Sequence, residues 1–219
     1  MSVHAVRTER MDITISLQAG YIFVQQKWKY NWLTNHPRYP NQTAWTYQEK
    51  KNFHNKSDQL IWELWSSKAY AVTTGDSELA QKYKDVKFPI NIDIKWTLPP
   101  NSAHWDVNVY KISESGIFQS YVEWSTRKIW LDSEDIKPRT RLLNQIPVAH
   151  EMGHSLGNSF YVTGVRMDEY PNKSHPHPTY GNDQRSMMNR GTEVRVRHFD
   201  YLKQQLNTLL PTANFDIII

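Results

Sequence analysis

The segment His150-Glu151-Met152-Gly153-His154 constrains the fold of this chain more than any other. Two histidines four residues apart lie on one face of an α-helix, about one turn from each other, so both imidazoles can reach a single metal ion. Glu151 lies too close in sequence to serve readily as a third ligand, but it can hydrogen-bond a metal-bound water and take its proton. The segment therefore predicts a helix with a metal site on one face.

Composition restricts the chemistry of that site. The chain contains no cysteine, so disulfides and thiolate ligands are excluded and the metal must be held by histidine and carboxylate groups. Catalytic zinc usually has three protein ligands and a water, whose pKa falls toward about 7 on binding. We therefore expect Zn²⁺ to bind His150 and His154, with Glu151 as the general base and a third ligand supplied from elsewhere in the chain.

Apolar periodicity predicts the elements that carry this segment. With 219 residues the chain suits one domain built around one sizeable core. Alternation of apolar and polar residues predicts strands, and apolar residues at helical spacing predict helices. The first predicted helix either continues through Asn55 or is interrupted there. The expected strands are 88–96, 106–112 and 128–131, and the expected helices are 46–72, 139–157 and 195–209. Pro147 lies either in the first turn of its helix or at a kink, and Gly157 is the expected C-terminal stop.

The N-terminal part is harder to assign. Residues 12–32 alternate in places, which indicates strands or an extended arm around Gly20, and 34–43 is expected to be a loop because of its prolines and polar residues. We therefore divide the chain into an N-terminal arm or strands at 1–33 and a main domain at 34–219. Residues 158–191 are expected to be rich in loops.

The motif helix and two later segments resemble a known family, the zincin metallopeptidases. With Gly157, the motif extends to the metzincin pattern His-Glu-x-x-His-x-x-Gly-x-x-His/Asp, but the third ligand of that pattern falls on Phe160, which cannot bind zinc. The sequences Asp168-Glu169-Tyr170 and Ser-Met-Met-Asn-Arg-Gly at 186–191 resemble the Asp-Glu-Tyr and Met-turn elements of bacterial zincins. These include metallopeptidase domains attached to VgrG spike proteins of type VI secretion. The resemblance covers about residues 146–200.

This resemblance implies an α+β, zincin-like fold, in which a twisted sheet and an active-site helix are followed by a helical C-terminal part. It implies that an acidic residue of the Asp-Glu-Tyr segment completes the zinc site, Glu169 being favoured over Asp168, and that Met188 belongs to an apolar floor. His198, in the segment Arg-Val-Arg-His, is comparable with a basic-His segment of the family and is a candidate donor to the tetrahedral intermediate.

Alternatives to these assignments remain open. If the segment around Glu169 is only a polar loop, another residue must be the third ligand, and the candidates are His175, His177, Asp183, Glu193 and His198. Prolines beside the first two of these keep their imidazoles out of any helix, which suggests a position on the rim. Tyr170 and Tyr180 are further candidate donors to the intermediate.

The resemblance implies a zinc-dependent endopeptidase, a hydrolase that cleaves peptide bonds through a zinc-bound water activated by Glu151. By the same resemblance it is an antibacterial effector toxin, with a protein or peptide substrate and with a secretion-spike protein and an immunity protein as partners. The alternative is a non-catalytic module that binds cell wall or a partner protein through its net charge of +4 and its Trp and Tyr residues.

Localisation and two further classes of partner follow from charge and hydropathy. Charged residues at 7, 9, 10 and 12 interrupt the apolar stretch that a signal peptide requires. We therefore expect another route to secrete the protein or deliver it into a target cell, where it would act in the periplasm. Scattered Arg and Lys residues without a recognition motif argue against nucleic acid as a partner. No segment approaches a membrane span.

Overall fold

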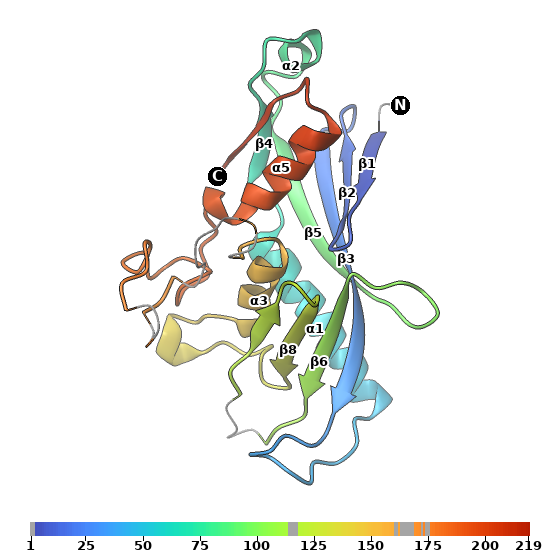
Figure 1. Ribbon diagram of the computed structural model, residues 1–219, viewed down its shortest axis with the longest axis vertical. Helices are drawn as coiled ribbons and strands as arrows, with labels where there is room; N and C mark the ends of the chain where they lie inside the picture. The colour runs from blue at the N-terminus through green and yellow to red at the C-terminus, as the bar shows by residue number, and fades with distance from the viewer. Residues whose placement is uncertain (1–2, 114–117, 160–161, 163–168, 172, 174–175) are drawn as a thin grey trace.

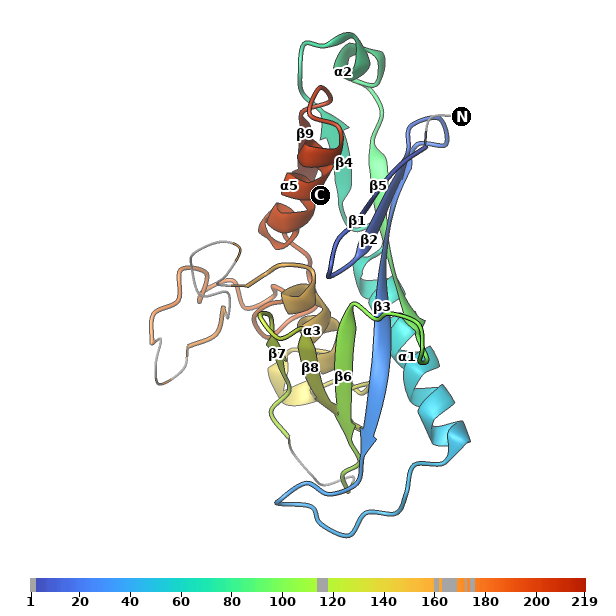
Figure 2. The same cartoon turned by 45° about the vertical axis from the view of Figure 1, so that its right-hand side comes forward.

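The protein is described by a computed structural model that covers residues 3–113, 118–159, 162, 169–171, 173 and 176–219. The described residues form a mixed α+β fold, as the sequence predicts, with one twisted sheet of nine strands (Figures 1 and 2). The strand order is β7-β8-β6-β3-β5-β4-β9, and a hairpin of β1 and β2 pairs with β3 through β2. The predicted Phe160, Asp168 and His175 positions lie outside the described residues.

Each of the strands predicted at 88–96, 106–112 and 128–131 has a counterpart in the sheet. Parallel pairing joins β3 to β5 and β6, and β6 to β8, whereas the strands at both edges run antiparallel to their neighbours. The strands are β1 (Val3–Arg7), β2 (Asp12–Ser16), β3 (Tyr21–Leu33), β4 (Tyr70–Thr73), β5 (Phe88–Trp96), β6 (Trp105–Tyr110), β7 (Tyr121–Glu123), β8 (Lys128–Asp132) and β9 (Phe215–Ile218).

The N-terminal strands belong to the body of the sheet. β3 is 13 residues long, and its alternate residues from Ile22 to Tyr30 are buried, so one face of the strand packs into the core. Because β3 lies between β5 and β6, the sheet combines strands from residues 1–33 with strands from 34–219. Gly20, with a φ of 72°, makes the turn before β3, a conformation that glycine adopts without strain.

The long helix α1 (Tyr47–Trp65) packs against β5 and presents Phe53, Ile61 and Trp65 to the core. A capping box starts it: the Thr46 hydroxyl accepts the Glu49 amide, and the Glu49 carboxylate accepts the Thr46 amide. The helix is unbroken near Asn55. The prediction that it continues to residue 72 is wrong, because the chain turns at Ser67, which has a φ of 57°, and then forms β4.

The motif helix α3 (Pro147–Ser155) is shorter than the predicted 139–157. Residues Thr140–Leu142 form a separate 3₁₀ turn, and the following Leu143 and Asn144 have φ values of 52° and 61°, which no α-helix tolerates. Pro147 therefore occupies the first turn, where its missing N–H leaves no hydrogen bond unmade. Gly157, with a φ of 114°, stands just beyond the end of the helix, as predicted.

The remaining helices lie in the half of the molecule that contains β4 and β9 (Figure 1). A short helix, α2 (Glu78–Lys82), connects β4 to β5, and α5 (Asp200–Leu209) follows the 3₁₀ turn η2 (Val196–Phe199). The predicted helix at 195–209 is thus confirmed apart from its first turn. Among the described residues, no helix combines the length and the apolar character needed to cross a membrane.

Candidate metal centre

The position of α3 is fixed by polar contacts along its length. The Trp65 indole at the end of α1 donates to the Ala149 carbonyl at 2.9 Å, and the buried Gln26 amide of β3 donates to the Ser155 carbonyl at 3.1 Å. The helix also packs against α1, β7 and β8. The Ser155 carbonyl belongs to the last turn of α3, where carbonyls have no intrahelical partner, so the Gln26 contact satisfies it. The helix is therefore held between the sheet and α1.

Both motif histidines have the same ring nitrogen turned toward a backbone carbonyl. His150 Nδ1 lies 2.7 Å from the Met187 oxygen, and His154 Nδ1 lies 2.8 Å from the Asn158 oxygen. A carbonyl oxygen can only accept, so these contacts place the proton of each ring on Nδ1. For His150 the Met187 oxygen is closer than the Gln145 amide nitrogen, a donor that lies 3.0 Å from the same Nδ1. Each Nε2 is then the unprotonated nitrogen that can coordinate a metal, which is the usual way in which outer contacts orient metal-binding histidines. The ring centroids are 5.0 Å apart.

The segment resembling a Met-turn lies beside α3. The Asn189 and Gly191 amides both donate to the Ser186 carbonyl, which closes a tight turn. Met188, fully buried, lies against Gly153: a Cβ at Gly153 would overlap the Met188 sulfur and lie 3.1 Å from the indole of Trp65. Glycine at this position therefore lets the turn approach α3 closely enough for its Met187 carbonyl to hold His150.

Two adjoining cavities meet at Glu151. The larger, of about 300 Å³, extends toward Arg139 and Arg190, and the smaller, of about 220 Å³, extends along β7 toward His154. Residues that line both are Gln119, Ser120, Glu151 and Tyr170. Glu151, the general base predicted from the sequence, thus lies between the two cavities.

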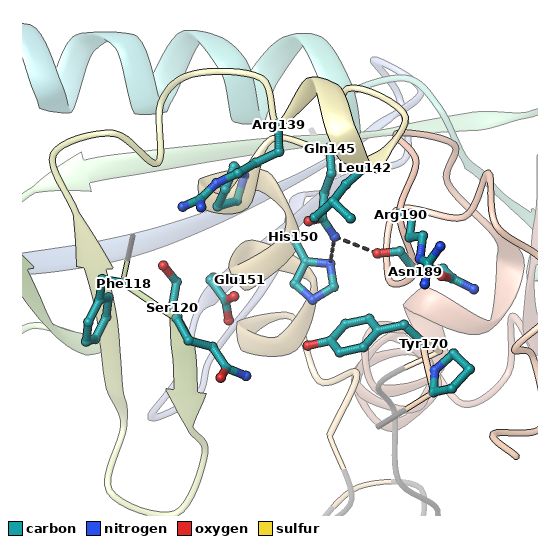
Figure 3. A pocket seen from close by; sticks show the side chains of 13 residues that line it. Phe118, Ser120, Arg139, Leu142, Gln145, His150, Glu151, Tyr170, Asn189 and Arg190 are labelled. Atoms are coloured by element: carbon teal, nitrogen blue, oxygen red, sulfur yellow. Dashed lines mark hydrogen bonds between the residues drawn. The ribbon is translucent and has the colours of Figure 1, made fainter. Parts of the chain in front are cut away.

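Tyr170 lies at the face of α3 that carries His150, as Figure 3 shows: its ring is beside the His150 imidazole, with a centroid distance of 6.0 Å. Its hydroxyl points toward the side on which Glu151 lies. The preceding backbone is tied to the Met-turn, since the Glu169 amide donates to the Met188 carbonyl and the Asn189 amide group donates to the Glu169 carbonyl. The two segments of the resemblance are therefore neighbours in space.

The Glu169 carboxylate takes part in a buried ion pair. Arg197 donates to both of its oxygens, at 2.7 and 2.9 Å, and the Glu169 side chain is 2% exposed. Burial alone would raise the pKa of Glu169, but hydrogen bonds from His198, Arg197 and Ser186 outweigh it and lower that pKa to about 2. The assignment of Glu169 as third metal ligand stays a prediction, although both oxygens already accept strong hydrogen bonds.

His198 is buried next to this ion pair. Its Nδ1 accepts the Arg195 amide at 3.1 Å, so the proton resides on Nε2, which lies 3.5 Å from Glu169 and 3.2 Å from the Ser186 hydroxyl. Burial lowers the pKa of His198, which favours its neutral form. The side chain lines neither cavity, and its contacts are those of a residue that positions Glu169.

The other candidate ligands are scattered. Asp183 forms ion pairs with Arg195 and Arg197, Glu193 pairs with Arg195, and His177 is exposed. Within the part of the chain that the structure describes, no three His, Cys, Asp or Glu side chains group around a metal position. His150 and His154 are thus brought together, whereas the third ligand is not among the described groupings.

Sequence reasoning missed a second acidic cluster, under the larger cavity. Asp132 and Asp135 are both fully buried, with Arg139 2.8 Å from Asp135 and 3.8 Å from Asp132. Burial and the mutual repulsion of the two acids raise the pKa of Asp132 to about 7, and burial raises that of Asp135. The Asp135 carboxylate accepts the Ser120 hydroxyl, so the cluster also orients a residue that lines both cavities.

Gln145 was missed as well. Its amide nitrogen donates to the Asn189 carbonyl and lies 3.0 Å from His150 Nδ1 (Figure 3). A glutamine two residues before the helix, in a stretch of apolar residues, was the sequence signal that pointed to a buried polar contact. This residue joins the start of α3 to the Met-turn.

Comparison of the chain with protein-family models, with curated proteins and with solved structures finds no match. The geometry of the site and the physical chemistry of its residues are therefore the basis of the functional assignment.

Proposed function

We propose that the protein is a zinc-dependent endopeptidase of zincin-like architecture. The observation that carries the proposal is the paired orientation of His150 and His154: the Nδ1 atom of each lies against a backbone carbonyl, so Nε2 is the ring nitrogen of each that can coordinate a metal. Two neutral imidazoles with no thiolate in the chain suit Zn²⁺. Glu151, at the junction of two cavities, is placed for proton transfer beside such an ion.

Zinc, when bound, supplies a Lewis acid that polarises the scissile carbonyl and lowers the pKa of water. Glu151 then takes the proton of the attacking water and passes it to the leaving amine. The Tyr170 hydroxyl, on the same side of the site, is the candidate donor to the oxyanion that develops on the carbonyl. In this proposal His198 positions Glu169 and does not contact the substrate.

The edge strand β7 favours an extended peptide as substrate. β7 is the last strand in the sheet order, so its outer edge has no strand partner among the described residues. Tyr121 and Val122 of this strand line the smaller cavity together with Glu151 and His154. Backbone groups of such an edge can pair with an extended chain, which would lay its peptide bond across Glu151.

For the third ligand we propose Asp168, with Glu169 as the alternative. Both oxygens of the Glu169 carboxylate accept hydrogen bonds from Arg197. We therefore favour the adjacent acid in the sequence, Asp168, as the zinc ligand. Zinc affinity of Asp168→Asn is expected to fall by about tenfold or more, because the loss of an outer contact to a ligand alone lowers metal affinity by about 10–100-fold. Glu169→Gln, measured in parallel by competition with a chelating dye, is the matched control. The reverse ranking of the two variants would assign Glu169 as the ligand.

The peptidase proposal is tested by zinc content and cleavage together. We expect about one zinc per chain, lost in His150→Ala and in His154→Ala. Glu151→Gln should retain zinc and lose cleavage of an unfolded protein substrate by a factor of about 10² or more. Equal cleavage by wild type and Glu151→Gln would remove Glu151 as general base. A native protein that binds no zinc would instead favour the alternative, a non-catalytic module that binds cell wall or a partner.

The resemblance to spike-associated metallopeptidase domains extends the proposal to an antibacterial effector with a spike protein and an immunity protein as partners. Its test is growth of a bacterium that produces the chain in the cytoplasm or, with an added export signal, in the periplasm. Growth inhibition confined to the exported wild type, and absent for exported Glu151→Gln, supports an effector acting in the periplasm. Normal growth in both compartments contradicts it.

A further inference from the structure

The larger cavity next to Glu151 has an unusual balance of charge. Arg139 and Arg190 reach its lining from different segments, and Figure 3 shows them on opposite sides of Gln145. Glu151 is the one acidic residue among its described lining residues. Around these, the wall is formed by the side chains of Phe118, Leu142, Pro147 and Pro171. A group that enters this space meets two guanidinium groups in a partly apolar enclosure.

Arg190 projects from a fixed backbone. It lies in the Met-turn, where its amide donates to the Gln184 carbonyl and the next amide, of Gly191, donates to the Ser186 carbonyl. Its side chain is exposed, and no described acid forms an ion pair with it. The positive charge is therefore available to a ligand.

Arg139 is oriented without being fully neutralised. One of its terminal nitrogens contacts Asp135 and Asp132, and the side chain remains 26% exposed toward the cavity. Because burial and repulsion from Asp135 raise the pKa of Asp132 to about 7, part of the negative charge of the pair is withdrawn near neutral pH. The remaining N–H groups of a guanidinium in a fixed orientation can bind a planar anion at two points.

We propose that the larger cavity binds a carboxylate of the substrate through Arg190 and Arg139, next to the bond that is cleaved. This inference rests on the proposed peptidase function. A volume of about 300 Å³ is at the small end of the range for ligand pockets, which suits one residue and not a folded segment. The carboxylate comes either from an acidic side chain or from the C-terminus of a peptide, and the test distinguishes these sources.

The test compares peptides that differ by one charge. For wild type, replacing Glu by Gln beside the cleaved bond should lower kcat/KM by about tenfold or more, the effect of one lost hydrogen bond to a charged group. Amidation of the C-terminus should have no such effect if the side chain is the source, and a comparable effect if the terminus is. Arg190→Gln should abolish the preference for the carboxylate, and Arg190→Lys should retain part of it.

A matched control, Arg185, lies five residues before Arg190. Arg185 belongs to the same loop, has a side chain that is 80% exposed and lines neither cavity, so Arg185→Gln should leave the preference unchanged. Equal loss of preference in Arg185→Gln and Arg190→Gln would show a general effect of surface charge and overturn the proposal.

Binding separates this inference from the peptidase proposal. The same peptides are titrated by calorimetry into zinc-free wild type, because a bound zinc would itself attract carboxylates. A preference for the acidic peptide that is lost in Arg190→Gln supports the carboxylate site, even if the zinc-loaded protein cleaves nothing and the peptidase proposal fails. Cleavage of acidic and neutral peptides at equal rates overturns the carboxylate site and leaves the peptidase proposal standing.

Discussion

Two clusters of acidic residues lie near the motif helix, and the pKa values of their acids are shifted in opposite directions. The cluster at the end of β8 consists of Asp132, Asp135 and Arg139, and the pKa values of both acids are raised. The cluster beside the Met-turn consists of Glu169, Asp183, Arg195 and Arg197, and the pKa values of both acids are lowered.

The cations and donors in contact with each acid explain the difference. In the first cluster two acids share one arginine, so burial and mutual repulsion are not offset. In the second, Glu169 accepts hydrogen bonds from His198 and Arg197, and Asp183 accepts them from Arg195 and Arg197, although Arg195 also pairs with Glu193. Burial is nearly complete for the acid in each case, at 0% exposure for Asp135 and 2% for Glu169, so burial alone does not set the direction.

Removal of Arg197 should give the largest effect. Arg197→Gln leaves the charge of Glu169 buried and uncompensated, and breaking a buried ion pair in this way costs about 3–5 kcal/mol. Urea unfolding at pH 7 with a chelator present, so that zinc does not contribute, measures the loss. Arg185→Gln, at the exposed position, should change the free energy of unfolding by about 0.5 kcal/mol or less. A loss below about 1 kcal/mol for Arg197→Gln would mean that the pair is not the main support of this loop.

The pH dependence of Glu169 should come next. The folded-state pKa is lowered to about 2, so the stability from this group is present above the unfolded value near 4 and is lost as pH falls toward 2. Glu169→Gln should therefore lose about 2 kcal/mol at pH 7, and the difference from wild type should disappear by about pH 2. A difference that stays constant across this range would contradict an electrostatic origin.

Asp132 should show the smallest effect, with the opposite sign. Its folded pKa is raised to about 7, so the stability gained from protonation is present below the unfolded value near 4 and is lost as pH rises through 7. Asp132→Asn should then be about 1 kcal/mol more stable than wild type at pH 8 and no more stable at pH 4. Thermal unfolding at the two pH values decides this, and a variant that is less stable at pH 8 would show that the charged form is favoured.

The sequence predicted local structure well wherever one pattern dominated. The alternating isoleucines of 88–96 predicted β5 with its observed bounds, because each of Ile90, Ile92 and Ile94 is buried on one face. The helix predicted at 139–157 was too long, because apolar spacing alone does not reveal that Leu143 and Asn144 adopt positive φ.

Contacts distant in sequence could not be predicted in this way. The motif predicted which residues lie at the cleft, His150, Glu151 and His154, but not the partners that orient them. Arg197 is 28 residues from Glu169, and no periodicity connects the two. The same holds for the Met187 carbonyl, since a backbone group leaves no trace in the sequence.

Gly153 has a consequence for how the site keeps its shape. The methionine turn touches α3 at a point where the helix has no side chain, and the same turn carries the carbonyl that holds His150. The orientation of the His150 imidazole thus depends on how closely the turn packs against α3 at Gly153. A single methyl group at position 153 would meet Met188 and Trp65, push the helix and the turn apart, and so shift the His150 ring indirectly.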